Sequence, residues 1–240
     1  MRPVVVGVSL RVMVADPPGE PCDRISHEWI RYLDHRGISP VLIPNVLREP
    51  VAFAERSGVR ALLLTSGGDV SSRAGAVAPA DGGARLERLR DATEWRLLEW
   101  AMKRRTPVLG VCRGMQALNV YFGGRLVRDL QEAGLPSLAH VGRRHRVRVV
   151  ESGEAVMTNS FHHHAVTTST LSAELQPLAV ADGEIVEAFS HRRLPVLGIQ
   201  WHPERPGSAT RLDRLLLDRW LGRRLQPRPP AKRYAQVGAR

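Results

Sequence analysis

The chain has few cysteines and few aromatic residues, and it contains no long apolar run. Its 240 residues include two cysteines, Cys22 and Cys112, and aromatic side chains make up 5% of the composition. One disulfide is formally allowed, but nothing indicates a densely cross-linked secreted scaffold. No apolar run approaches the ~20 residues that a membrane-spanning helix needs. The first residues read as a strand rather than a signal peptide. We therefore expect a cytoplasmic protein with no membrane partner.

The charge balance is strongly basic. Lys and Arg together number 35, against 24 Asp and Glu, which gives a formal net charge of +11. Arginine is spread through the chain and accumulates in residues 219–240, but no RNA- or DNA-binding motif accompanies it. We therefore expect no nucleic-acid partner. An acidic or phosphorylated small substrate is compatible with the charge.

Apolar runs and amphipathic segments alternate along much of the chain. Strands are predicted over residues 3–10, 40–43, 59–65, 107–111 and 195–199. Helices are predicted from a cap at Asp23 to Gly37, near 51–54, over 86–105 and over 210–221. Strands return over 145–150, 156–160, 175–181 and 185–189, the last two forming a hairpin about Asp182 and Gly183.

This alternation predicts an α/β fold, a doubly wound, mostly parallel sheet flanked by helices, with a small antiparallel β addition. The length suits one domain over residues 1–222. Loops are expected over 13–23 and 71–85. The basic, Pro-rich residues 223–240 predict a disordered tail.

A strand that turns sharply into a helix surrounds Cys112. Residues 107–111 fit a buried strand, and residues 115–122 have helical spacing. Gly110 and Gly114 flank the cysteine, and this G-x-C-x-G core has the form of a nucleophile elbow with cysteine in place of serine. Such a turn strains the backbone and places the thiol at a helix N-terminus, where the macrodipole favours thiolate. The alternative is a buried structural cysteine.

A second predicted strand, 195–199, leads into Trp201-His202-Pro203-Glu204. A thiol nucleophile needs an imidazole to take its proton, and the imidazole needs a third group to fix its tautomer. Residues i and i+2 of an extended segment lie on the same side, so Glu204 can orient His202. Either residue alone could simply be solvated at a strand end. Together, after a second strand, they favour a relay with Cys112.

These two motifs, residues 110–116 and 201–204, resemble the class I glutamine amidotransferase superfamily, and within it the γ-glutamyl hydrolases of the peptidase C26 group. The resemblance extends over nearly all of residues 3–222 and implies the flavodoxin-like fold of that superfamily. It implies that Cys112 is the nucleophile, His202 the general base and acid, and Glu204 the orienting carboxylate.

A glycine pair, Gly67 and Gly68, follows the predicted strand 59–65. Glycine lets a backbone approach a substrate closely, and the C-terminal edge of this strand faces the crevice that the elbow faces. An isolated Gly-Gly can equally be a plain turn. The family resemblance implies that the amides of Gly68 and Arg113 form the oxyanion hole. It also leads us to assign glutamyl binding to Gly67, Gln116, Ser160 and Phe161.

Three consecutive histidines, at positions 162–164, suggest a metal, but adjacent residues cannot all converge on one ion in regular structure. We therefore predict no metal and no organic cofactor. Three acidic residues could have either a structural role or a contact with the substrate. Asp91 and Glu94, in the segment 90–94, are read as mainly structural but could face the substrate, and Glu187 could approach the substrate amine.

The resemblance implies hydrolysis of a γ-glutamyl amide through a γ-glutamyl thioester, with a small-molecule substrate. The leaving group stays open between γ-aminobutyrate, other amines and CDP-amidate, and a basic chain suits the last of these. Two alternatives belong to other classes. One is a glutaminase subunit that passes ammonia to a separate synthetase. The other is a non-catalytic binding module, against which the intact Cys112, His202 and Glu204 argue. A homodimer is also left open.

Overall fold

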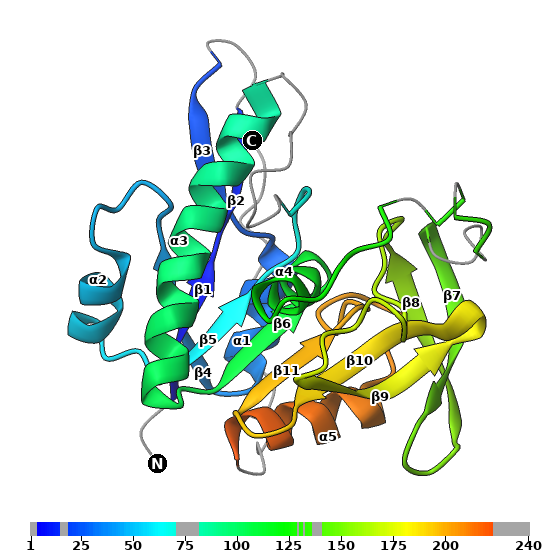
Figure 1. Cartoon of the computed structure of the whole chain (residues 1–240). Helices are drawn as coiled ribbons and strands as arrows, with labels where there is room; N and C mark the ends of the chain where they lie inside the picture. The colour runs from blue at the N-terminus through cyan, green and yellow to red at the C-terminus, as the bar shows by residue number, and fades with distance from the viewer. Residues whose placement is uncertain are drawn as a thin grey trace, which may run out of the picture.

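The computed structural model describes residues 4–14, 19–70, 82–128, 130–131, 133–135 and 141–222, with only the backbone described at 82–87 and 141. These residues form a nine-stranded sheet with helices on both faces, and a separate two-stranded ribbon (Figure 1). No helix in these ranges is long and apolar enough to cross a membrane.

One half of the sheet is parallel and has the predicted doubly wound order. Its strands are β1 (Val4–Ser9), β4 (Ile38–Ile43), β5 (Ala61–Leu64), β6 (Val108–Val111) and β11 (Val196–Ile199). They lie in the order β4-β1-β5-β6-β11, so the chain winds first to one side of β1 and then to the other. The carboxyl ends of these strands share one edge of the sheet, where such folds bind ligands.

The other half is antiparallel and continues the same sheet beyond β11. Its strands are β10 (Ile185–His191), β9 (Leu175–Ala181), β7 (Val141–Val149) and β8 (Ala155–Phe161). The predicted hairpin is confirmed, because β9 and β10 pair across the short 3-10 turn η1 (Asp182–Glu184). The antiparallel addition is thus four strands wide and forms the right-hand part of the view in Figure 1.

Five α-helices in the described ranges cover the sheet: α1 (His27–His35), α2 (Pro50–Arg56), α3 (Gly82–Arg104), α4 (Arg113–Tyr121) and α5 (Thr210–Leu221). Leu33 of α1 and Trp220 of α5 share one buried cluster. Leu97 of α3 and Met115 of α4 share a second buried cluster with Ala54 of α2. The two clusters lie on opposite faces of the sheet, which explains why the parallel strands are apolar on both sides.

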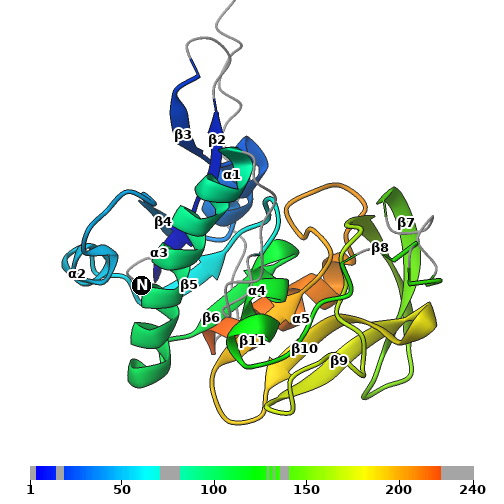
Figure 2. The ribbon, with the colours of Figure 1, turned by 45° about the horizontal axis from the view of Figure 1, so that its top comes forward.

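The loop predicted over 13–23 is wrong at both ends, where residues 13–14 and 21–23 belong to strands. Strands β2 (Arg11–Val14) and β3 (Pro21–Arg24) pair antiparallel and project beyond the sheet (Figure 2). The cap predicted at Asp23 is also wrong, because Ser26 occupies the N-cap position of α1. The Asp23 carboxylate instead accepts hydrogen bonds from the backbone N–H and the side-chain amide of Asn45, at 2.7 and 2.6 Å.

Helix α3 differs from its prediction at its start. It begins at Gly82, within the loop expected over 71–85, whose residues 71–81 lie outside the described ranges. Its side chains are buried at Thr93, Leu97 and Ala101, but Leu89 is 38% exposed. Buried charged side chains take the inward positions at that end of the helix instead. The predicted disordered tail, 223–240, also lies outside the described residues.

Candidate active site

The predicted elbow is present where β6 passes into α4. Cys112 is the N-cap of α4 and has φ 54° and ψ −108°, a conformation that is strained for any residue with a side chain. Two glycines make the close approach possible. A Cβ on Gly114 would lie 2.2 Å from the Leu64 carbonyl oxygen, and one on Gly110 would lie 2.4 Å from the Gly114 carbonyl oxygen. The sequence therefore holds the thiol at the carboxyl edge of the sheet, at a helix N-terminus.

Strand β11 brings the histidine to the same edge. It runs parallel to β6 with Ile199 opposite Val111, and the Cys112 N–H donates to the Ile199 carbonyl at 2.8 Å. The chain leaves β11 at that level, so His202 lies three residues beyond the last strand residue and beside the elbow. Two parallel neighbours thus bring together residues that are ninety positions apart in the sequence.

Cys112, His202 and Glu204 lie together at this edge. The His202 Nδ1 lies 2.7 Å from Glu204 Oε1, and Cys112 is close enough to the imidazole to raise its pKa. With Nδ1–H donated to the carboxylate, the other ring nitrogen is the one available to the thiol. The imidazole is 2% exposed and Cys112 is 7% exposed, so both side chains are shielded from water.

The protonation of His202 follows from these neighbours. Burial by itself lowers the pKa of an imidazole, but the hydrogen bond and charge of Cys112, followed by those of Glu204, outweigh burial. Together they raise the pKa of His202 to about 9. The imidazole is therefore held as imidazolium near neutral pH, beside the sulfur atom.

Asn159 on β8 fixes the backbone of the histidine, a role that sequence reasoning missed. Its Oδ1 accepts from the His202 N–H at 2.9 Å, and its Nδ2 donates to the His202 carbonyl at 2.9 Å. The same Nδ2 lies 3.1 Å from the Pro206 carbonyl. We call this set of bonds the Asn159 clamp. It could not be read from the sequence, because it links the antiparallel half of the sheet to the segment after β11.

A pocket above the thiol collects most of the predicted substrate-binding residues. It is lined by Gly67, Gly68, Asp69, Cys112, Arg113, Gln116, Phe161, His162, His163 and His164. The Phe161 ring also packs edge-on against His202, with ring centroids 5.4 Å apart. Ser160, also assigned to glutamyl binding, is fully buried and does not line this pocket. The pocket therefore joins the glycine loop after β5, the start of α4 and the segment after β8.

A buried ionic cluster lies behind the glycine loop. Arg113 pairs with both Asp91 and Glu94, and Glu94 also accepts from Arg90 at 2.9 Å. Burial raises the pKa of Glu94, but the charges of Arg113 and Arg90 outweigh it and hold that pKa below its usual value. Neither acidic residue lines the pocket.

The same cluster supports the loop that carries the glycine pair. The Arg90 guanidinium donates to the carbonyls of Thr65 and Ser66 at 2.6 and 3.0 Å. A Cβ on Gly67 would lie 2.0 Å from Arg90 Nη1, so glycine at this position lets the loop pack against the buried guanidinium.

Glu187 lies in a second buried cluster rather than at the substrate pocket. It is 0% exposed, and one of its oxygens lies 3.4 Å from the Nε2 atoms of both His145 and His162. Burial raises its pKa, but the two histidines outweigh burial and lower that pKa to about 2. The carboxylate is thus an internal partner of His162, which itself lines the pocket.

Comparison with known proteins finds several relatives of this chain. A relative from Schizosaccharomyces pombe is 34% identical over 128 residues, 48% of this chain and 50% of that protein, so the match spans half of that relative. The γ-glutamyl-CDP-amidate hydrolase of Campylobacter jejuni is 26% identical over 216 residues, 90% of this chain and 96% of that protein. The γ-glutamyl-γ-aminobutyrate hydrolase of Escherichia coli is 27% identical over 233 residues, covering 83% and 86%.

A solved glutamine amidotransferase from Methylobacillus flagellatus shares the fold. It superposes with a TM-score of 0.58 at 15% identity, covering 98% of this chain and 100% of that one. A family model also matches the sequence directly, over residues 4–204, which include both the elbow and the histidine–glutamate pair. Because that match covers most of the 240 residues, the chain belongs to the peptidase C26 family.

Proposed function

We propose that this protein hydrolyses a γ-glutamyl amide through a γ-glutamyl thioester on Cys112. The observation that carries the proposal is the arrangement of three side chains: Cys112 beside His202, and His202 hydrogen-bonded to Glu204, with the thiol at a strained elbow beneath a pocket. A buried structural cysteine would need neither a histidine partner nor a carboxylate behind that histidine. The C. jejuni and E. coli relatives, named as γ-glutamyl hydrolases, support the substrate class.

The first half of the reaction uses the Cys112 thiolate and the His202 imidazolium. The Cys112 sulfur, having passed its proton to His202, attacks the γ-carbonyl carbon, and the carbonyl oxygen becomes an oxyanion. The Gly68 and Arg113 amides are the proposed donors to that oxygen. Arg113 is the first residue of α4, where backbone N–H groups have no acceptor within the helix. Collapse of the intermediate breaks the C–N bond, and the imidazolium protonates the leaving nitrogen.

The second half releases glutamate. Water gives a proton to the now neutral His202 and attacks the thioester carbon, and the second tetrahedral intermediate uses the same two amides. Its collapse expels the Cys112 thiolate and leaves the imidazole protonated, which restores the starting pair. Glu204 holds the imidazole orientation in both halves, at 2.7 Å from Nδ1. No step requires a metal or an organic cofactor.

For the leaving group we favour a phosphorylated one, of the γ-glutamyl-CDP-amidate type, over γ-aminobutyrate. The C. jejuni relative has the larger coverage of the two, and Arg205 offers a cation near the pocket. Its guanidinium carbon lies 4.6 Å from the centroid of the Phe161 ring, and its side chain is 36% exposed. On this proposal, Arg205→Ala raises KM for the phosphorylated substrate and leaves KM for γ-glutamyl-γ-aminobutyrate close to wild type.

The test measures glutamate release from γ-glutamyl-CDP-amidate, γ-glutamyl-γ-aminobutyrate and glutamine. We expect turnover of at least one γ-glutamyl amide, and a loss of at least ~10³-fold in Cys112→Ala. Cys22→Ala is the matched control, because the Cys22 thiol is exposed on β3, and it should keep wild-type activity.

A second readout is direct. Rapid acid quenching during turnover should leave one γ-glutamyl group on Cys112, detected by intact mass and peptide mapping. Unchanged turnover in Cys112→Ala would refute the nucleophile. Slow turnover of glutamine alone, accelerated by a synthetase partner, would instead favour a glutaminase subunit.

A further inference from the structure

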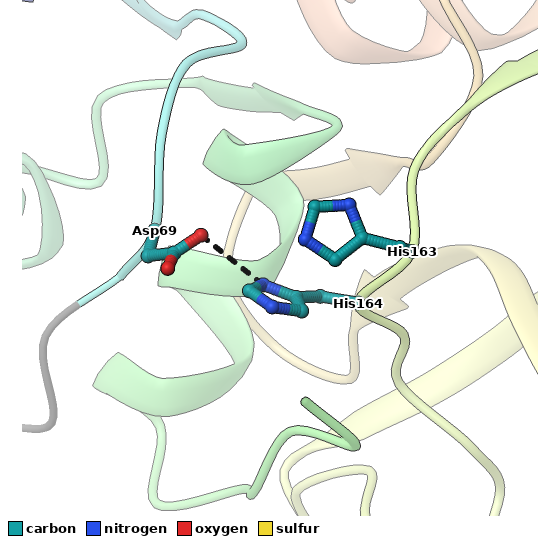
Figure 3. A group of neighbouring side chains, drawn as sticks. All are labelled: Asp69, His163 and His164. Atoms are coloured by element: carbon teal, nitrogen blue, oxygen red, sulfur yellow. Dashed lines mark ion pairs between the residues drawn. The ribbon is translucent and has the colours of Figure 1, made fainter. Parts of the chain in front are cut away.

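The three consecutive histidines point in two directions. His162 is 4% exposed and faces Glu187, at 3.4 Å. His163 and His164 lie instead beside Asp69, which follows the glycine pair after β5 (Figure 3). Three adjacent residues in regular structure cannot all bind one ion, as argued from the sequence. However, the chain leaves β8 at Phe161, so His163 and His164 are not in a strand. The irregular backbone beyond it lets the two later imidazoles approach the same carboxylate.

The geometry of these three side chains is close to that of a metal site. One ligand atom from each of Asp69, His163 and His164 lies within 4.8 Å of the others. The His164 Nδ1 and the Asp69 Oδ1 are 3.5 Å apart. Two ligand atoms bound to a tetrahedral Zn²⁺ lie about 3.4 Å apart, given bonds of 2.0–2.1 Å. Asp69 and His163 are exposed, so small side-chain rotations can close the remaining separation.

His164 is the fixed member of the group. Its backbone carbonyl accepts from the Gln116 side chain at 3.2 Å and lies 2.9 Å from the His162 Nδ1. Its side chain is 14% exposed, against 62% for Asp69. The backbone of one ligand residue is therefore held in place before any ion binds, and the more exposed carboxylate lies toward solvent.

We propose that Asp69, His163 and His164 form a binding site for a divalent transition-metal ion of the Zn²⁺ type, and that the bound ion inhibits the hydrolase. Two imidazoles and one carboxylate favour such an ion over Mg²⁺ or Ca²⁺, which prefer oxygen ligands throughout. Three protein ligands leave a fourth position open, as in zinc sites that exchange a ligand.

Inhibition follows from the position of the site and rests on the proposed function. The three ligands line the same pocket as Cys112 and Gly68, so an ion held there occupies the space that a γ-glutamyl group needs. A thiolate is also a good ligand for Zn²⁺, and its capture at the open position would withdraw the nucleophile. The ion is thus an inhibitor, with no part in the hydrolytic steps.

Binding is tested first, without reference to activity. Tag-free full-length protein carrying Cys22→Ser and Cys112→Ala has no thiol, and it is titrated with Zn²⁺ by calorimetry and with Co²⁺ by visible absorption. We expect one ion per chain, and at least tenfold weaker binding after Asp69→Ala or His164→Ala. His35→Gln, at an exposed histidine of α1, is the matched control and should bind like its parent. No binding to the thiol-free protein, or equal binding by all variants, would overturn the site.

Inhibition is tested second, in the enzyme with both thiols intact. Glutamate release should fall as Zn²⁺ is added and recover with a chelator. The Zn²⁺ concentration for half-inhibition, measured against each variant's own metal-free rate, should rise at least tenfold in His163→Ala. Full activity at saturating Zn²⁺ would overturn the inhibitory role. If the proposed function is wrong, the metal-free enzyme will release no glutamate. The Zn²⁺ and Co²⁺ titrations of the thiol-free protein still test the metal site in that case.

Discussion

Replacing Asn159 by alanine should impair catalysis through the backbone of His202. The variant removes the acceptor of the His202 N–H and a donor to the His202 carbonyl, both at 2.9 Å and both buried. Each buried polar group left without a partner costs about 1–3 kcal/mol, so for the two groups we expect the free energy of unfolding to fall by about 2–6 kcal/mol. A displacement of the imidazole by ~1 Å should lower kcat about 10²-fold. KM should change little, because Asn159 does not line the pocket.

The assay combines urea unfolding with kcat and KM for glutamate release, under conditions where the variant is folded. Asn119→Ala is a matched control. Asn119 is also a fully buried amide that holds backbone groups, donating to the Arg125 carbonyl at 2.8 Å and accepting from the Ser172 N–H at 2.9 Å. It should lose similar stability and keep its kcat. Wild-type kcat in Asn159→Ala, or an equal fall in both variants, would refute the clamp as a positioning device.

Three further predictions concern the relay, the ionic cluster and the elbow. The pKa of His202, about 9 in the wild type, should fall in Cys112→Ala, because burial remains while the influence of the thiol is lost. NMR titration of the imidazole measures this pKa. An unchanged value would contradict the coupling of Cys112 and His202. Because the pKa of Glu94 is lowered in the folded protein, its carboxylate stabilises the fold at pH values above the unfolded-state pKa of about 4.5. This contribution is lost as the pH falls toward the folded-state pKa. Glu94→Gln should therefore cost about 3–5 kcal/mol near neutral pH in urea unfolding, and the difference from wild type should shrink on acidification; a difference independent of pH would count against it. Gly114→Ala should lower the free energy of unfolding by about 1–3 kcal/mol, since its Cβ would lie 2.2 Å from the Leu64 carbonyl oxygen. An unshifted midpoint of thermal unfolding would show that the elbow accommodates a methyl group at this position.

The sequence was sufficient where local pattern and sheet geometry agree. The apolar runs before Cys112 and His202 identify two strands, and parallel pairing of β6 and β11 then places the residues that follow them at one edge. The strained turn at Cys112 follows from the small residues around it. These features depend on neighbours in the sequence and on one rule of topology.

What the sequence did not predict depends on contacts between distant segments. Asp23 has the form of a helix cap, but it lies in β3, which pairs with β2, and its carboxylate is bonded to Asn45 instead. Arg90 resembles a solvated helix residue, yet it is 0% exposed because the loop after β5 and Glu94 surround it. Asn159 has no sequence signal that separates it from a substrate ligand. In each case the partner of a polar group was decided by tertiary structure.

The ionic cluster connects the segments that carry the two proposed oxyanion donors, the Gly68 and Arg113 amides. Arg90 carries the loop before Gly68, Arg113 directly follows the nucleophile, and Glu94 connects the two guanidinium groups. Three buried charged side chains therefore link the glycine loop to the start of α4, so we expect a change in the position of one to alter the other. In the history of such a chain these charges should therefore be kept or replaced together. A descendant that loses Arg90 but retains Glu94 would keep its sulfur and its imidazole, and would lose the alignment that makes them useful.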